Sequence, residues 1–106
     1  MTVLKISPGQ RPEVMDISHK LEELQKLVGG CIQAIYPFED PVALVCNDEG
    51  KLLNLEPSRS IRNPEGRIIE IICGTFLICG LGREDFISLT KEQIDFYTKS
   101  DRKSVV

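Results

Sequence analysis

The sequence predicts an α+β protein with a mainly antiparallel sheet, an N-terminal β-hairpin, and two helices packed on the sheet. Short apolar runs alternate with turn residues between positions 29 and 80, which is typical of strands in an antiparallel sheet. Two other segments carry apolar residues at helical spacing. The length of 106 residues fits a single domain over residues 1–106. The simplest arrangement places both helices on one face of the sheet.

The chain opens with the predicted hairpin. Residues 2–6 and 13–17 are short strand-like runs, and Pro8-Gly9 lies between them. Proline presets the first turn position and glycine accepts a positive φ at the second, so a tight reversal is expected there.

The first helix is predicted over residues 21–28, where leucine and valine recur at helical spacing and form one apolar stripe. Ser18 precedes it as a candidate N-cap through its hydroxyl. Gly29 ends it, because glycine accepts the left-handed conformation found at helix C-termini.

The middle of the chain predicts further strands. Residues 31–36 and 42–46 are apolar, and the second run is apolar at both odd and even positions. Such a strand is buried on both faces and is therefore expected at the centre of the sheet. Residues 47–50 are typical of a hairpin turn, so residues 51–55 are expected to pair back as a strand.

The longest polar connection is expected over residues 56–67. It ends in Asn63-Pro64-Glu65-Gly66, which suits a type I turn. Strands are then predicted over 68–73 and 75–79, with Gly74 between them as a bulge or a close backbone approach.

The last predicted element is a helix that begins after Thr90. Thr90 and Gln93 have the spacing of a capping box, in which each side chain bonds the other residue's backbone N–H. Leu89 and Ile94 flank the cap at the positions of a hydrophobic staple, and Tyr97 is expected to dock the helix on the sheet.

Composition and charge limit the functions to consider. With 13 basic and 16 acidic residues the net charge is -3, which argues against bulk nucleic-acid binding. The sequence contains no apolar run long enough for a membrane span, and residues 1–10 lack the long apolar region of a secretory signal. A cytoplasmic location is therefore expected.

The sequence offers little support for catalysis, metal binding or a cofactor. His19 is the single histidine and has no partner nearby in sequence that would make it a catalytic base. The four cysteines show no CxxC spacing and lie in or beside apolar runs, so they are interpreted as small buried hydrophobes in preference to zinc ligands or disulfides. They are Cys31, Cys46, Cys73 and Cys79.

The best candidate for a binding site is the polar connection itself. Arg59 and Arg62 can grip phosphate or carboxylate oxygens with bidentate guanidinium groups, and Asn63 can add hydrogen bonds. Tyr36 and Phe38 can offer a flat apolar surface to a ring. The competing interpretation is that both arginines face water or pair with acids nearby in the sequence. Those acids are Glu56, Glu65 and Glu70.

An ordered set of short motifs also resembles one protein family. The set comprises Pro8-Gly9, Gly29-Gly30, Tyr36-Pro37-Phe38, Val42-Ala43-Leu44, Glu49-Gly50-Lys51-Leu52, Arg59-Ser60-Ile61-Arg62 and Gly74-Thr75-Phe76. In these motifs the chain resembles the short phage, plasmid and Gram-positive bacterial proteins grouped as domain of unknown function 3846. The resemblance implies a mobile-element setting and a bacterial host cell, and it implies no catalytic mechanism.

Two functional hypotheses follow. The first is a non-enzymatic, homo-oligomeric protein that sequesters a small anionic ligand, such as a nucleotide signal of host defence, and so acts as a sponge. Arg59 and Arg62 would neutralise the phosphate, and Tyr36 or Phe38 would stack on the base. The second is a protein-interaction module that inhibits a host protein, for which the acidic net charge is suited. An enzyme is the least favoured alternative.

Overall fold

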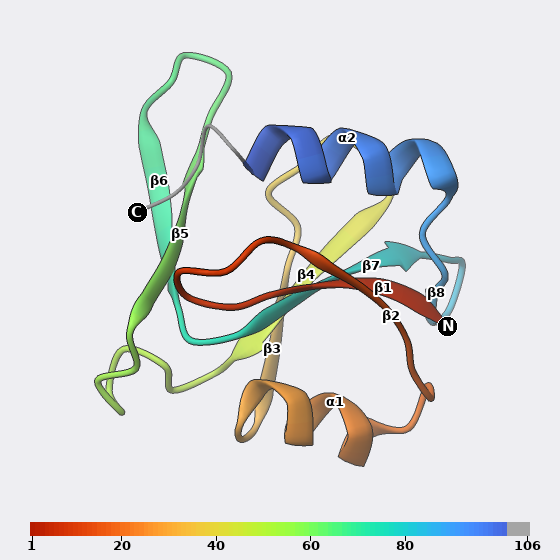
Figure 1. Ribbon diagram of the computed structural model, residues 1–106, viewed down its shortest axis with the longest axis horizontal. Helices are drawn as coiled ribbons and strands as arrows, with labels where there is room; N and C mark the ends of the chain where they lie inside the picture. The colour runs from red at the N-terminus through yellow and green to blue at the C-terminus, as the bar shows by residue number, and fades with distance from the viewer. Residues whose placement is uncertain (102–106) are drawn as a thin grey trace.

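Six antiparallel strands form the main sheet of the computed structural model, which describes residues 1–101 (Figure 1). Their order is β2-β1-β7-β4-β3, and β8 pairs with β7. A separate antiparallel pair consists of β5 and β6. This arrangement confirms the predicted fold class and the N-terminal hairpin. The elements are β1 (Thr2–Ile6), β2 (Glu13–Asp16), α1 (Leu21–Val28), β3 (Ile32–Ile35), β4 (Val42–Asn47), β5 (Pro57–Arg62), β6 (Ile68–Cys73), β7 (Phe76–Leu81), β8 (Phe86–Ile87) and α2 (Lys91–Asp101).

The two helices lie on opposite faces of the main sheet, so the expectation that they share one face was wrong (Figure 1). The cause lies in the two central strands, β4 and β7, which are apolar on both faces. Leu44 and Ile78 are register partners and join the core under α2 and the β5–β6 pair. Val45 and Leu77, the adjacent partners, join the core under α1. Each face therefore needs its own cover to remove these side chains from water.

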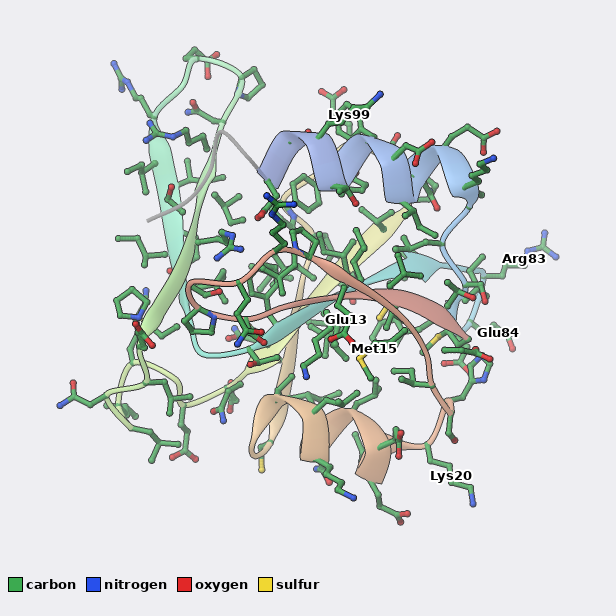
Figure 2. All side chains as sticks on the ribbon, viewed as in Figure 1. Glu13, Met15, Lys20, Arg83, Glu84 and Lys99 are labelled. Atoms are coloured by element: carbon green, nitrogen blue, oxygen red, sulfur yellow. The ribbon has the colours of Figure 1, made fainter. Side chains whose placement is uncertain are left out.

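Apolar side chains fill the space between the sheet and each helix, and charged side chains lie on the outer surfaces (Figure 2). Met15 on β2 packs on the core that α1 covers. Lys20, just before α1, and Lys99, on α2, are exposed at the two outer surfaces of the molecule. No helix within residues 1–101 is long and apolar enough to cross a membrane.

Residues 51–55 were predicted as a strand and form a series of turns instead. The Leu53 N–H donates to the Glu49 carbonyl at 2.9 Å, and the Leu55 N–H donates to the Gly50 carbonyl at 3.0 Å. The physical reason is the position of β4. Both of its edges are already paired, one with β3 and the other with β7, so a hairpin partner has no free edge to join.

The predicted polar connection over residues 56–67 was wrong in its first half, because residues 57–62 form β5. Three of its polar side chains, Ser58, Arg59 and Ser60, are buried, which a hydropathy pattern does not reveal. The turn over residues 63–66 is confirmed, since the Gly66 N–H donates to the Asn63 carbonyl at 2.9 Å and Gly66 has a φ of 85°.

The helix ends match the sequence in part. Gly29 has a φ of 82° and closes α1, as predicted. Ser18 is not the N-cap of α1. That position belongs to Lys20, whose own N–H donates to the Ser18 hydroxyl at 3.1 Å. At α2 the capping box is confirmed: the Thr90 N–H donates to Gln93 Oε1 at 2.9 Å, and the Gln93 N–H donates to Thr90 Oγ1 at 3.1 Å.

Replacing Thr90 with alanine removes one of these two capping bonds. The free energy of unfolding is expected to fall by about 1 kcal/mol, the usual cost of losing an N-cap hydroxyl. Urea unfolding followed by circular dichroism measures this loss. Thr90→Ser keeps the hydroxyl and should unfold near the wild-type midpoint. An unchanged midpoint for Thr90→Ala would show that the box does not stabilise α2.

Candidate functional site

A cavity of about 240 Å³ lies between β5, α2 and the segment that follows β3. Its walls are mostly apolar and aromatic, with contributions from Phe38, Ile61, Phe96 and Tyr97. Two arginines also line it, Arg59 and Arg62. Three of the five residues predicted from sequence, namely Phe38 and the two arginines, are therefore brought to one place by the fold.

Arg59 is buried in this wall, with 2% of its surface exposed. Arg59 lies two residues before Ile61 on β5, and side chains two residues apart in a strand point to the same face. The Arg59 side chain therefore shares its face of β5 with a core residue. Its guanidinium forms a two-point ion pair with Asp101 at the end of α2. Arg59 Nε lies 2.5 Å from Asp101 Oδ1, and Nη2 lies 3.1 Å from Oδ2.

The remaining N–H groups of Arg59 donate to backbone carbonyls. Nη1 bonds the carbonyl of Ser58 at 2.8 Å and that of Ser7 at 3.4 Å, and Nη2 bonds the carbonyl of Gln10. A guanidinium has five N–H donors, and these contacts occupy all five. Arg59 therefore has no donor left for a ligand. The acid that pairs with it is Asp101, which was not among the acids considered from sequence.

Arg62 stands at the end of β5 and is exposed. Its Nη1 donates to the Gly66 carbonyl at 2.8 Å, across the turn between β5 and β6. Asn63 stabilises the same turn, since its Oδ1 accepts from the Arg67 N–H at 2.9 Å. Asn63 is not among the residues that line the cavity. Of the two arginines that line the cavity, Arg62 is therefore the exposed one.

Three aromatic rings meet at the cavity. The Tyr97 ring centre lies 4.9 Å from that of Phe38 and 5.0 Å from that of Phe96. The Tyr97 hydroxyl donates to Asp40 Oδ2 at 3.2 Å. Burial, and next the negative charge of Asp40, raise the pKa of Tyr97, so its hydroxyl stays protonated at neutral pH.

Tyr36 was predicted to be a site residue and Phe96 was not, but the structure places Phe96, and not Tyr36, at the cavity. Tyr36 is 59% exposed and does not line the cavity. Phe96 is 57% exposed and does line it, although it was not among the candidate residues chosen from the sequence. The available signal was that two successive aromatic residues on one helix point about 100° apart, so they cannot both pack in the core.

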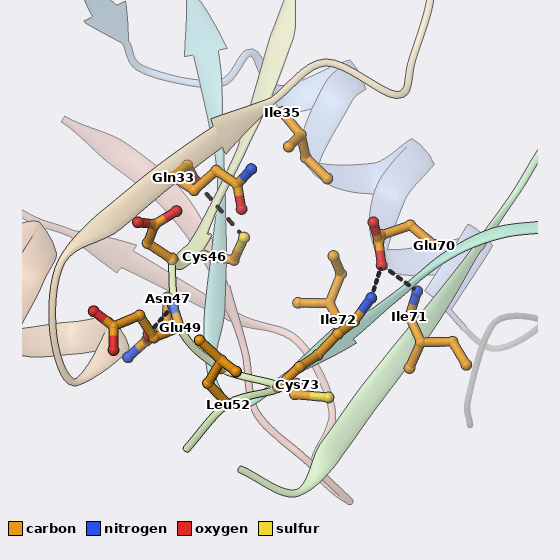
Figure 3. Close-up of a pocket in the computed structure, with 13 residues that line it drawn as sticks. Gln33, Ile35, Cys46, Asn47, Glu49, Leu52, Glu70, Ile71, Ile72 and Cys73 are labelled. Carbon is orange, nitrogen blue, oxygen red and sulfur yellow. Dashed lines mark hydrogen bonds and ion pairs between the residues drawn. The ribbon is translucent and has the colours of Figure 1, made fainter. Parts of the chain in front are cut away.

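A second cavity, of about 130 Å³, lies between β3, β4 and β6 (Figure 3). Cys46 and Cys73 line it, and the ion pair between Lys51 and Glu70 stands at its edge. Burial, and to a lesser degree the nearby Glu70, raise the pKa of Cys46, so its thiol is protonated at neutral pH. That state is a poor nucleophile.

The other thiols vary in their surroundings. Cys79 is buried with its pKa raised to about 12 by burial, and Cys73 is half-buried. Cys31 is exposed, so the interpretation of all four as buried hydrophobes was wrong for this residue. His19 is exposed, and within residues 1–101 no group of three His, Cys, Asp or Glu side chains is arranged to hold a metal ion.

Comparison with known proteins identifies one family. The sequence model of the family described as Domain of unknown function (DUF3846) matches residues 1–101. No curated protein and no solved structure gives a significant match.

Proposed function

The chain belongs to the DUF3846 family, and we propose that it is a non-enzymatic protein that binds a small ligand carrying a flat ring and an anionic group, such as a nucleotide. The binding site is the aromatic cavity between β5 and α2. The proposal includes sequestration of this ligand in the cytoplasm of a bacterial host cell, in keeping with the mobile-element setting that the family resemblance implies.

The observation that carries the proposal is the meeting of three aromatic rings and one exposed cation at a single cavity. Phe38 comes from a segment far in sequence from α2, which carries both Phe96 and Tyr97, yet all three line the cavity. Exposed aromatic faces suit stacking on a ring, and an exposed guanidinium suits an anionic oxygen. Phe96 and Arg62 are the exposed members of this set.

Arg59 has a different role in this proposal from the one predicted at first. Because all of its donors are engaged, it shapes the cavity wall and does not contact the anion. Its charge is balanced by Asp101, which also lines the cavity. Arg62 therefore supplies the uncompensated positive charge among the described lining residues, as a singly charged group on the ligand requires.

Two properties of the site favour a protein that binds the ligand without catalysing a reaction of it. Tyr97 keeps its proton at neutral pH, and the carboxylate of Asp101 is held in an ion pair, so neither is suited to act as a catalytic base. The volume of about 240 Å³ is also below the usual 300–1,000 Å³ of drug-sized ligand sites. It suits one ring, and the rest of the ligand would extend past Arg62 or against a second subunit.

Isothermal titration calorimetry with a panel of cyclic nucleotides, mononucleotides and ADP-ribose tests the proposal. The wild type should bind at least one of them, and Phe96→Ala and Arg62→Ala should each weaken that binding about tenfold. This is the effect of losing about 1.4 kcal/mol, within the range of one stacking contact.

Tyr36→Ala serves as the matched control, because Tyr36 is as exposed as Phe96 but lies outside the cavity. It should bind like the wild type. The proposal fails if the panel gives no binding, or if Phe96→Ala and Tyr36→Ala bind equally well.

A further inference from the structure

Strand β6 carries three exposed isoleucines. Ile68 is 50% exposed, Ile69 is 52% exposed and Ile71 is 37% exposed. Within the described part of the chain β6 pairs with β5 alone, so one edge has no strand partner. An apolar strand with a free edge is a template for pairing with another chain.

Three features of the structure close this edge. The first is a bulge: Glu70 pairs with Ile61 but Ile68 pairs with Arg62, so Ile69 is an extra residue without a partner. A bulge twists a strand and interrupts the regular row of peptide groups that an added strand would need. It protects the half of β6 that precedes Glu70.

The second feature is the packing of the turn after β4 against the far end of β6. A methyl group added at Gly50 would lie 2.9 Å from the Cys73 carbonyl oxygen, so the two backbones are in close contact. No strand can enter between them. Ile71, between the bulge and this contact, is thus the position where the edge is still open.

The third feature covers that position. The carboxylate of Glu70 folds back, and its Oε1 accepts a hydrogen bond of 3.0 Å from the N–H of Ile71 (Figure 3). The same oxygen lies 2.5 Å from Nζ of Lys51, a residue of the turn that covers Cys73. Glu70 thus occupies the donor that an added strand would use, and Lys51 holds it there.

We propose that Glu70, positioned by Lys51, prevents a second copy of this chain from adding a strand to the free edge of β6. A charged side chain at an edge adds the cost of its own desolvation to any such pairing. The proposal is independent of the ligand site, because Glu70 and Lys51 line the other cavity.

Sedimentation velocity on the full chain, from about 10 μM to about 500 μM, tests this proposal through the concentration dependence of the mass. Glu70→Ala should associate at about tenfold lower concentration than the wild type, and Lys51→Met should show a smaller shift in the same direction. Adding Ile71→Lys to Glu70→Ala should restore wild-type behaviour, because a lysine then stands at the open position.

Glu65→Ala is the control, since it removes the same charge from an exposed position in the turn between β5 and β6. It should sediment like the wild type. The proposal is overturned if folded Glu70→Ala sediments like the wild type. It is also overturned if Glu65→Ala shifts as far, because net charge alone would then explain the association.

Discussion

Arg59→Met is expected to lower the free energy of unfolding by about 3–5 kcal/mol, the usual loss when one member of a buried ion pair is removed. The substitution leaves the carboxylate of Asp101, which is 9% exposed, without its partner. It also removes the donors that hold the Ser7 and Gln10 carbonyls of the β1–β2 turn. Arg59 joins β5, this turn and the end of α2, so its loss loosens three elements together.

Chemical unfolding followed by far-UV circular dichroism measures this effect, since the chain contains no tryptophan. Arg59→Met combined with Asp101→Leu should be less destabilised than Arg59→Met alone, because no charge is then left buried without a partner. A loss below about 1 kcal/mol for Arg59→Met would match an exposed ion pair and contradict the structural role of Arg59.

Ser58, the neighbour of Arg59, provides a matched control. It is 1% exposed, and its hydroxyl has no hydrogen-bond partner among residues 1–101. Ser58→Ala removes a buried polar group that makes no bond, so it should leave the stability unchanged or raise it. The contrast between two adjacent buried positions separates the ion pair from the general effect of altering β5.

The different fates of Arg59 and Thr90 show what the sequence reveals. The capping box at Thr90 was predictable because both partners lie within four residues and the pattern depends only on local geometry. Arg59 was expected to meet a ligand because it stands among polar residues. Its partner Asp101 lies 42 residues away, and no local pattern connects the two.

The same distinction applies to the elements of the fold. The run over residues 42–46 was recognised as central because it is apolar on both faces, and β4 is buried along its whole length. β5 was missed because Ser58, Arg59 and Ser60 are polar yet buried, and the partners of Arg59 are supplied largely by other segments. The turns over residues 51–55 were mistaken for a strand because the sequence does not show that both edges of β4 are taken.

The candidate site was predictable to a similar extent. Phe38 and Arg62 were chosen for their chemistry, and the fold places them at one cavity. Phe96 was not chosen, since its contribution depends on how α2 is rotated against the sheet. Tyr36 was chosen for the same chemistry as Phe38, but β3 ends at Ile35 and the chain bends over residues 38–40, so the two rings take different positions and only Phe38 lines the cavity.

The second large effect is expected for Phe76→Ala, which should destabilise the fold by about 3–5 kcal/mol, the range for removing a buried aromatic ring. Phe76 is 1% exposed and packs in the core under α2. Phe76→Leu keeps most of the volume and should lose less than about 1.5 kcal/mol. Thermal and urea unfolding of the two variants give the comparison directly.

Phe96 is the matched control, because both phenylalanines line the candidate cavity but Phe96 is largely exposed. Phe96→Ala should stay within about 0.5 kcal/mol of the wild-type stability, while it loses ligand affinity. If Phe76→Ala and Phe96→Ala were equally stable, the core assignment of Phe76 would be wrong. If Phe96→Ala lost stability as well, weaker binding by that variant would no longer identify Phe96 as a ligand contact, because unfolding would account for it.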